Sequence, residues 1–168
     1  MGRSILVHVL QKIVRHLPIS EQDQTKLYYL KRLGYITSDK SNYTLSLKGI
    51  RLLNEEAVWS LTISKPKVWD KKWHLVLFDI PKDKRKRRDA FRLRLKELGL
   101  VLYQNSVWIY PYPLQNTIEQ IAAFYALHGC VSFITADALT GEKNLLQHFK
   151  LKRKYYHAHS LLPRSNKN

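Results

Sequence analysis

The chain has 168 residues, of which 45% are hydrophobic, and it carries a formal net charge of +16 with a pI near 10.0. Its single cysteine, Cys130, excludes an internal disulfide and a cysteine metal cluster, and is typical of a protein of the reducing cytoplasm. The longest apolar-leaning stretch, 5–17, is interrupted by polar residues and too short to span a bilayer, and no cleavable signal pattern is found, so we expect no membrane partner.

The first part of the chain begins with two predicted helices. Hydrophobic residues at helical spacing predict a helix over 5–17, which Pro18 ends. Ser20 and Asp23 resemble a capping pair at the start of a second helix, and Gly34 is a natural stop for it. These two helices are expected to begin a small separate domain over residues 1–64.

Two short strands and a further helix complete this domain, over 35–37, 43–47 and 48–56. The order helix, helix, hairpin, helix is a winged-helix outline, so we expect residues 1–64 to bind DNA, with the second helix in the major groove and the hairpin turn near phosphate. The residues expected to face DNA are Gln22, Gln24, Thr25, Lys26, Tyr28 and Lys31 on the helix and Lys40 in the turn. The alternative is a small domain for protein contact or dimerisation.

A polar, proline-marked segment over 65–72 is predicted to be a linker. The aromatic and β-branched run Trp73 to Ile80 then predicts a strand that Pro81 stops, because proline lacks the amide hydrogen that a strand ladder needs. Asp79 is therefore expected at the C-terminal end of this strand.

A strongly basic helix is predicted over 83–98, with Phe91, Leu95 and Leu98 facing a core and Gly99 as its stop. Nine Lys or Arg lie between Lys82 and Lys96, against only two aspartates. Four of them share one stripe of the helix that can reach solvent. The alternative is a charged face that is merely solvated, and we favour a stripe that binds backbone phosphate. The residues expected to bind nucleic acid here are Lys84 and the stripe of Arg85, Arg88, Arg92 and Lys96.

The remaining elements complete an α+β pattern. A hairpin over 100–104 and 106–112, a helix over 114–128 and a strand over 130–136 give the order strand, helix, strand, strand, helix, strand. This is the ferredoxin-like order, which we expect over residues 73–149. Both helices then cover one sheet face, and the opposite face is expected to be left for a partner such as a second copy.

The C-terminal stretch 144–159 is predicted to be helical, and residues 150–168 form a basic tail. Lys152 and Arg153 are further candidates for nucleic-acid contact. Tyr155 and Tyr156 either pack against the domain or stack on bases.

Five features of the second part of the chain occur together: WHLVLFDIP from Trp73, the basic helix, Leu98-Gly99, QNSVW from Gln104 and YPYP from Tyr110. In this combination they resemble the PaaX-type repressors of phenylacetate catabolism. The resemblance implies a winged-helix domain joined to a central ferredoxin-like domain, which is itself similar to the small dimeric nuclease of the CRISPR spacer-acquisition machinery. It implies a cytoplasmic, homodimeric transcriptional repressor that binds double-stranded DNA and needs no cofactor. Full-length repressors carry a further C-terminal domain for ligand response, whereas this sequence ends soon after the ferredoxin-like domain. We therefore do not expect it to recognise an aromatic acyl-CoA.

The CRISPR resemblance also implies a metal-binding role for Asp79, with Ser106 in the matching hairpin motif. Two Asp79 carboxylates of a dimer would then hold Mg²⁺, which activates water against a phosphodiester. The alternatives for Asp79 are a helix cap or an ion pair with Arg85 or Arg88. Three functions therefore stay open: a DNA-binding regulator, which we favour, a Mg²⁺-dependent endonuclease, and a non-catalytic DNA scaffold for a CRISPR integrase.

Overall fold

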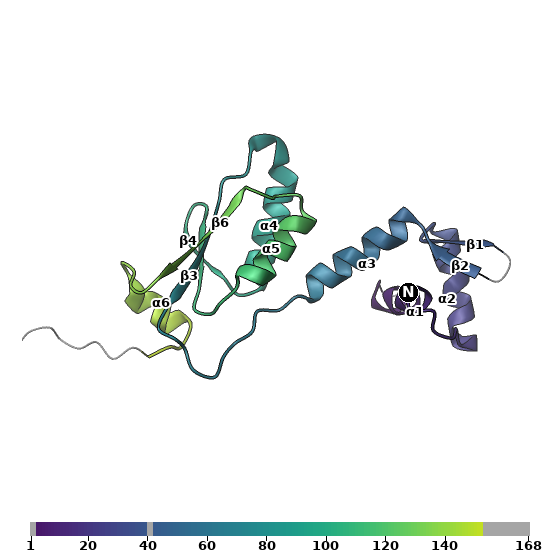
Figure 1. Ribbon diagram of the computed structural model, residues 1–168, viewed down its shortest axis with the longest axis horizontal. Helices are drawn as coiled ribbons and strands as arrows, with labels where there is room; N and C mark the ends of the chain where they lie inside the picture. The colour runs from purple at the N-terminus through teal and green to yellow at the C-terminus, as the bar shows by residue number, and fades with distance from the viewer. Residues whose placement is uncertain (1–2, 40–41, 153–168) are drawn as a thin grey trace, which may run out of the picture.

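The computed structural model describes residues 3–39 and 42–152, which form the predicted mixture of helices and sheets (Figure 1). Among these residues, no helix combines the length and the apolar composition that crossing a membrane requires. The N-terminal part shows the predicted order helix, helix, hairpin, helix. Its elements are α1 Arg3–Val14, α2 Glu21–Arg32, β1 Ile36–Asp39, β2 Asn42–Leu45 and α3 Leu47–Ser60.

The N-terminal elements share one hydrophobic core. Val9 and Leu10 of α1, Leu27 and Leu30 of α2, and Ile36 of β1 are buried together. These side chains recur at three- and four-residue spacing on the helices, so each helix turns one apolar face toward the other and toward the hairpin. The opposite face of α2 remains in solvent.

Ser20 and Asp23 do not form the predicted capping pair. Ser20 makes no side-chain hydrogen bond to the α2 backbone and instead donates to Asp23 Oδ2 at 2.8 Å. Asp23 is itself buried and accepts hydrogen bonds from Lys12 Nζ and Lys26 Nζ, both at 2.7 Å. These lysines, Lys12 first, lower the pKa of the Asp23 carboxyl below its ordinary value. The prediction failed because the carboxylate finds two cations in three dimensions, one of them on another helix.

The second part of the chain contains a four-stranded antiparallel sheet in the order β4-β5-β3-β6. With the helices between the strands, this is the predicted ferredoxin-like arrangement. Strand β3 lies between β5 and β6, and Val76 pairs with Trp108 on one side and Phe133 on the other. The elements are β3 Trp73–Phe78, the short 3₁₀ helix η1 Lys82–Lys84, α4 Arg85–Glu97, β4 Val101–Gln104, β5 Val107–Tyr110, α5 Gln115–Phe124, β6 Val131–Ala136 and α6 Glu142–His148.

Helices α4 and α5 lie on the same face of this sheet (Figure 1). Phe91 and Leu95 of α4 and Ile118 and Ile121 of α5 are fully buried there. They pack with Val76 and other side chains of the sheet in one core. Most charged residues of α4 are therefore turned away from this core, whereas Arg94 is buried.

The opposite sheet face is covered in part by the chain itself, whereas Ile134 of β6 on the same face remains 49% exposed, and a partner on this face stays a prediction. Leu145 and Leu146 of α6 pack with Trp73, Leu75 and Ile109 in a separate core. Strand β3 consequently has buried residues on both faces, as expected for a central strand with a continuous apolar run.

Helix α6 begins earlier and ends much earlier than predicted. It runs from Glu142 to His148, and Lys150 has a positive φ of 55°, a left-handed conformation that an α-helix does not continue through. The rest of the predicted helix, 153–159 with Tyr155 and Tyr156, lies outside the described residues.

Helix α3 connects the two parts of the molecule (Figure 1). Its middle belongs to the N-terminal core through Leu52, whereas Val58 near its end is buried in the core beneath the sheet. Ile63, just after the helix, is buried in the same core, and no helix or strand is formed between α3 and β3. Residues 61–63 thus pack on the sheet-containing body before the segment predicted as a linker.

Candidate nucleic-acid interface

Helix α4 is oriented by its apolar side. Phe91 and Leu95 are fully buried against the sheet, and Gly99, with a φ of +88°, ends the helix in the left-handed conformation that glycine adopts readily. At the other end, Pro81 precedes η1, whose single turn leads into α4. The rotation of α4 is therefore set by its core contacts, and its charged side chains, apart from that of Arg94, lie on the remaining surface.

The predicted basic stripe lies on this outer surface. The Arg85 side chain is 79% exposed and that of Arg88 is 26% exposed, and Lys96 is exposed further along the helix. Asp89 approaches both arginines, at 3.7 Å from Arg85 Nε and 3.8 Å from Arg88 Nε. Surface pairs of this length contribute little, and one carboxylate cannot neutralise two guanidinium groups. Lys84 at the start of the helix is half-buried.

Arg92 connects the stripe to the β4–β5 turn. Its guanidinium lies 5.6 Å from the centre of the Phe78 ring, and its Nη2 donates to the Asn105 carbonyl at 3.3 Å. The Nε atoms of Arg88 and Arg92 are shielded from solvent and make no hydrogen bond within the described part of the chain. These two nitrogens are therefore not themselves open to an anion from solvent.

Arg94 behaves differently from every residue of the stripe. Its side chain is 6% exposed, and its Nη2 donates to the Leu61 carbonyl at 2.6 Å. Sequence reasoning missed this residue. The signal was present, because Arg94 is three residues after Phe91 and four before Leu98, a spacing that places it beside the apolar face.

Asp79 is exposed at the end of β3, as predicted, and its backbone N–H donates to the Cys130 carbonyl at 3.0 Å. Among the residues that the structure describes, neither alternative role is present: Pro81 and Lys84 occupy the cap positions of η1 and α4, and Arg85 and Arg88 approach Asp89 instead. Ser106 lies in the β4–β5 turn, where its carbonyl accepts from the Phe78 N–H.

The described residues do not by themselves make a metal site. No group of three or more His, Cys, Asp or Glu side chains with metal-binding geometry occurs among them. Asp79 contributes one carboxylate, and magnesium in proteins is usually held by one or two carboxylates together with waters and substrate phosphates. The Mg²⁺ site with Asp79 from each of two copies stays a prediction.

The candidates on α2 fall into two classes. Gln24 and Thr25 are exposed and belong to the solvent face of the helix. Lys26 is held by Asp23, and Lys31 donates to Ser38 Oγ of β1 at 2.7 Å. The remaining members of this face are also exposed, namely Gln22 and Tyr28.

Of the other three predicted contacts, one is among the described residues. Lys152 is exposed near the end of the described chain. Lys40 and Arg153 lie outside the described residues.

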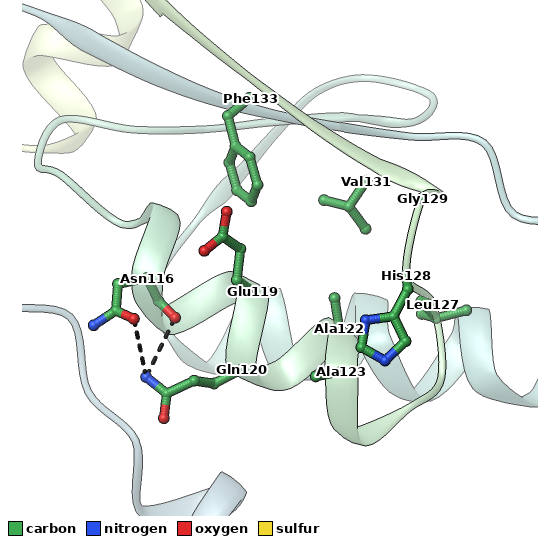
Figure 2. Close-up of a pocket in the computed structure, with 10 residues that line it drawn as sticks. All are labelled: Asn116, Glu119, Gln120, Ala122, Ala123, Leu127, His128, Gly129, Val131 and Phe133. Carbon is green, nitrogen blue, oxygen red and sulfur yellow. Dashed lines mark hydrogen bonds between the residues drawn. The ribbon is translucent and has the colours of Figure 1, made fainter.

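Two surface hollows differ in charge. One, of about 540 Å³, lies at the start of α4 and is lined by the consecutive residues 83–87, four of which are basic. The other, of about 510 Å³, lies between α5 and β6, and Figure 2 shows Glu119 and Phe133 extending toward each other across it. Its lining contains no Lys or Arg, so of these two hollows the one at α4 suits a phosphate better.

The second part of the chain matches a known protein family. Residues 66–147 match the family described as the PaaX protein central Cas2-like domain. The match includes β3, the basic helix, the β4–β5 hairpin and most of α6. A search of curated proteins found no match to this chain.

Proposed function

Residues 66–147 belong to the family of the PaaX protein central Cas2-like domain, and from this we propose that the chain is a DNA-binding transcriptional regulator that acts as a homodimer. The observation that carries the proposal is the basic stripe of α4. Its cations project from a helix whose rotation is set by core packing, and a single aspartate lies close to two of them. Such a surface binds backbone phosphate without reading sequence.

The charge of the whole chain supports a nucleic acid over a small anion. Before Trp73 the sequence holds 13 basic and 6 acidic residues, and from Trp73 onward it holds 16 and 7, so the two parts carry +7 and +9. A polyanion that extends along the molecule can interact with both parts, whereas a single phosphate cannot.

The N-terminal part supplies the sequence-reading surface in this proposal. Its order of helix, helix, hairpin, helix is that of a winged helix, and α2 exposes Gln24 and Thr25 beside Tyr28. Amide and hydroxyl side chains of this kind hydrogen-bond to base edges in the major groove. Lys26 contributes less, because Asp23 already holds its ammonium group.

A second candidate function is a Mg²⁺-dependent endonuclease. The observation that favours it is the exposed position of Asp79 at the end of β3, with neither a helix cap nor an arginine pair to occupy its carboxylate among the described residues. A DNA scaffold for an integrase would use the same basic stripe without Asp79. We rank both below the regulator because neither requires the N-terminal part.

The test is a salt titration of binding to duplex DNA. Replacing Arg85, Arg88 and Lys96 with Gln should reduce the slope of log affinity against log salt by about 2 to 3, because each lost phosphate contact removes about 0.9. A matched control replaces Lys65, Lys67 and Lys143 with Gln, since these exposed lysines lie outside the predicted interface and remove the same charge.

Equal slopes for the two triple variants, or failure of the parent protein to bind duplex at low salt, would overturn the proposal. Sedimentation of the parent protein tests the dimer. Cleavage assays with and without Mg²⁺ test the second candidate: Asp79→Asn should abolish cleavage while leaving affinity intact, and an inactive parent protein removes the nuclease altogether.

A further inference from the structure

Arg94 is the buried member of an otherwise solvent-directed set of cations on α4. Its side chain is 6% exposed, compared with 79% for Arg85 on the same helix. Burying a guanidinium group is unfavourable unless its donors and charge are matched. Its Nη2 is bonded to the segment that leaves α3 and its Nη1 lies near Glu97, whereas its Nε is shielded from solvent and makes no hydrogen bond among the described residues.

Three contacts define the position of this guanidinium group. Arg94 Nη2 donates to the carbonyl of Leu61, the residue that caps the C-terminus of α3, at 2.6 Å. The guanidinium carbon lies 5.1 Å from the centre of the Trp59 ring in the last turn of α3. On its own helix, Arg94 Nη1 lies 3.5 Å from Glu97 Oε2. Arg94 therefore joins α4 directly to the end of α3.

Further contacts hold the same segment to the body. Val58 and Ile63 are buried in the core that α4 and α5 form on the sheet. Thr117 Oγ1 of α5 donates to the Thr62 carbonyl at 3.4 Å. Helix α3 also belongs to the N-terminal core through Leu52, so its end cannot move on the body without moving the N-terminal part.

We propose that Arg94 is a positioning residue that holds α3, and with it the N-terminal part, in one orientation relative to the basic helix. It thereby sets the spacing between the α2 surface and the α4 stripe. Its role is carried by the hydrogen bond to Leu61 and the cation–π contact with Trp59, and it does not contact DNA.

Arginine suits this position better than lysine. The planar guanidinium group can donate in its plane to a carbonyl while its face lies over an aromatic ring, whereas an ammonium group offers a compact charge without a flat face. Because the cation–π contact with tryptophan and the bond to a carbonyl act on one rigid group, together they restrain the position of the end of α3 on α4.

The consequence for DNA rests on the proposed function. Two surfaces held at a fixed spacing bind one duplex as a pair, and loosening the connection lowers the effective concentration of the second surface. The position of Arg94 can nevertheless be tested without DNA, so failure of the two ideas can be told apart.

The first arm measures a distance between spin labels in the full chain. Labels are placed at Glu21→Cys on α2 and Lys143→Cys on α6, both exposed positions, in a Cys130→Ser background. We expect a narrow distance distribution in this parent and a broad one after Arg94→Met. Arg92→Met is the matched control, because it removes the same charge from the same helix but contacts the β4–β5 turn. A narrow distribution for Arg94→Met, or equal broadening by Arg92→Met, overturns the inference.

If Arg94→Met does not fold by circular dichroism, Trp59→Leu decides instead. It removes the ring beneath the guanidinium group and leaves Arg94 in place. A broadened distribution supports the inference, and an unchanged one overturns it.

The second arm measures affinity for two duplexes. For Arg94→Met we expect about a 10-fold loss on a duplex of about 30 base pairs and little loss on one of about 10 base pairs, which is too short to reach both surfaces. Equal losses on both duplexes contradict the paired binding. If the parent protein ignores DNA altogether, the proposed function falls, and the distance measurement still decides the role of Arg94.

Discussion

Trp73 donates a hydrogen bond from its indole Nε1 to Glu142 Oε1 at 2.6 Å, across 69 positions of the sequence. Both residues are buried. The bond joins the first residue of β3 to the first residue of α6, on the sheet face that α6 covers. It satisfies a buried donor and helps to hold α6 on that face.

Replacing Glu142 with Ala should therefore destabilise the fold. The Trp73 N–H loses its partner, and a buried donor without one costs about 1–3 kcal/mol. The measurement is urea unfolding followed by tryptophan fluorescence. Glu142→Gln is the control, since its amide oxygen can still accept, and we expect a smaller loss from it. Equal losses from the two variants would contradict this explanation.

Gly49 should not tolerate even a methyl group. A Cβ at this position would overlap the Tyr35 carbonyl oxygen, which also accepts from the Ser46 N–H. In an unobstructed helix, Gly→Ala stabilises by roughly 1 kcal/mol, so destabilisation by Gly49→Ala would reveal the steric conflict. We expect a net loss of about 1–3 kcal/mol by thermal or chemical unfolding. Asn54→Ala, at an exposed position of the same helix, should be near neutral.

Asp23→Asn should loosen the connection between α1 and α2. In the parent protein the Asp23 carboxylate forms ion pairs with Lys12 and Lys26. The neutral amide of Asn cannot form these ion pairs. Because these contacts lower the pKa of Asp23, the stabilisation is present above its unfolded value of 3.8 and is lost as the pH falls below it. The melting temperature at neutral pH should drop. At acidic pH, where the parent carboxylate is also being protonated, the difference between the two proteins should shrink.

His74 should make the fold less stable in mild acid. Burial lowers the pKa of His74 from its reference of 6.5, with Lys72 acting in the same direction and Asp70 opposing. The folded protein therefore takes up the proton less readily than the unfolded chain, so stability is lost as the pH falls below about 6.5. His74→Phe removes this group. The stability difference between the two proteins should change steadily between roughly pH 7.5 and pH 5, and a constant difference would contradict the prediction.

Many of the elements could be predicted because their signals are local. The apolar run from Trp73 with Pro81 behind it predicted β3, and the spacing of Phe91 and Leu95 predicted the buried side of α4. The order of these elements then led to the ferredoxin-like sheet, since few topologies accommodate that order.

The errors arose where a residue found its partner far away in the sequence. Asp23 looked like half of a helix cap but binds Lys12, which lies on another helix. The sequence did not indicate that α6 covers part of the second sheet face, because this short helix was predicted as part of a longer C-terminal helix. Arg94 was counted with the other cations of α4, although the carbonyl that it binds belongs to Leu61, 33 positions away.

By itself, the sequence determined the secondary-structure order, the positive charge and the amphipathic pattern of the basic helix, because these depend on residue type and on spacing within one element. Only the tertiary structure decided which cations remain available to a ligand. Arg85 reaches solvent whereas Arg94 is buried against the end of α3, and this difference depends on how the helices pack. Burial and pairing are properties of neighbours in space, and these neighbours meet only when the chain has folded.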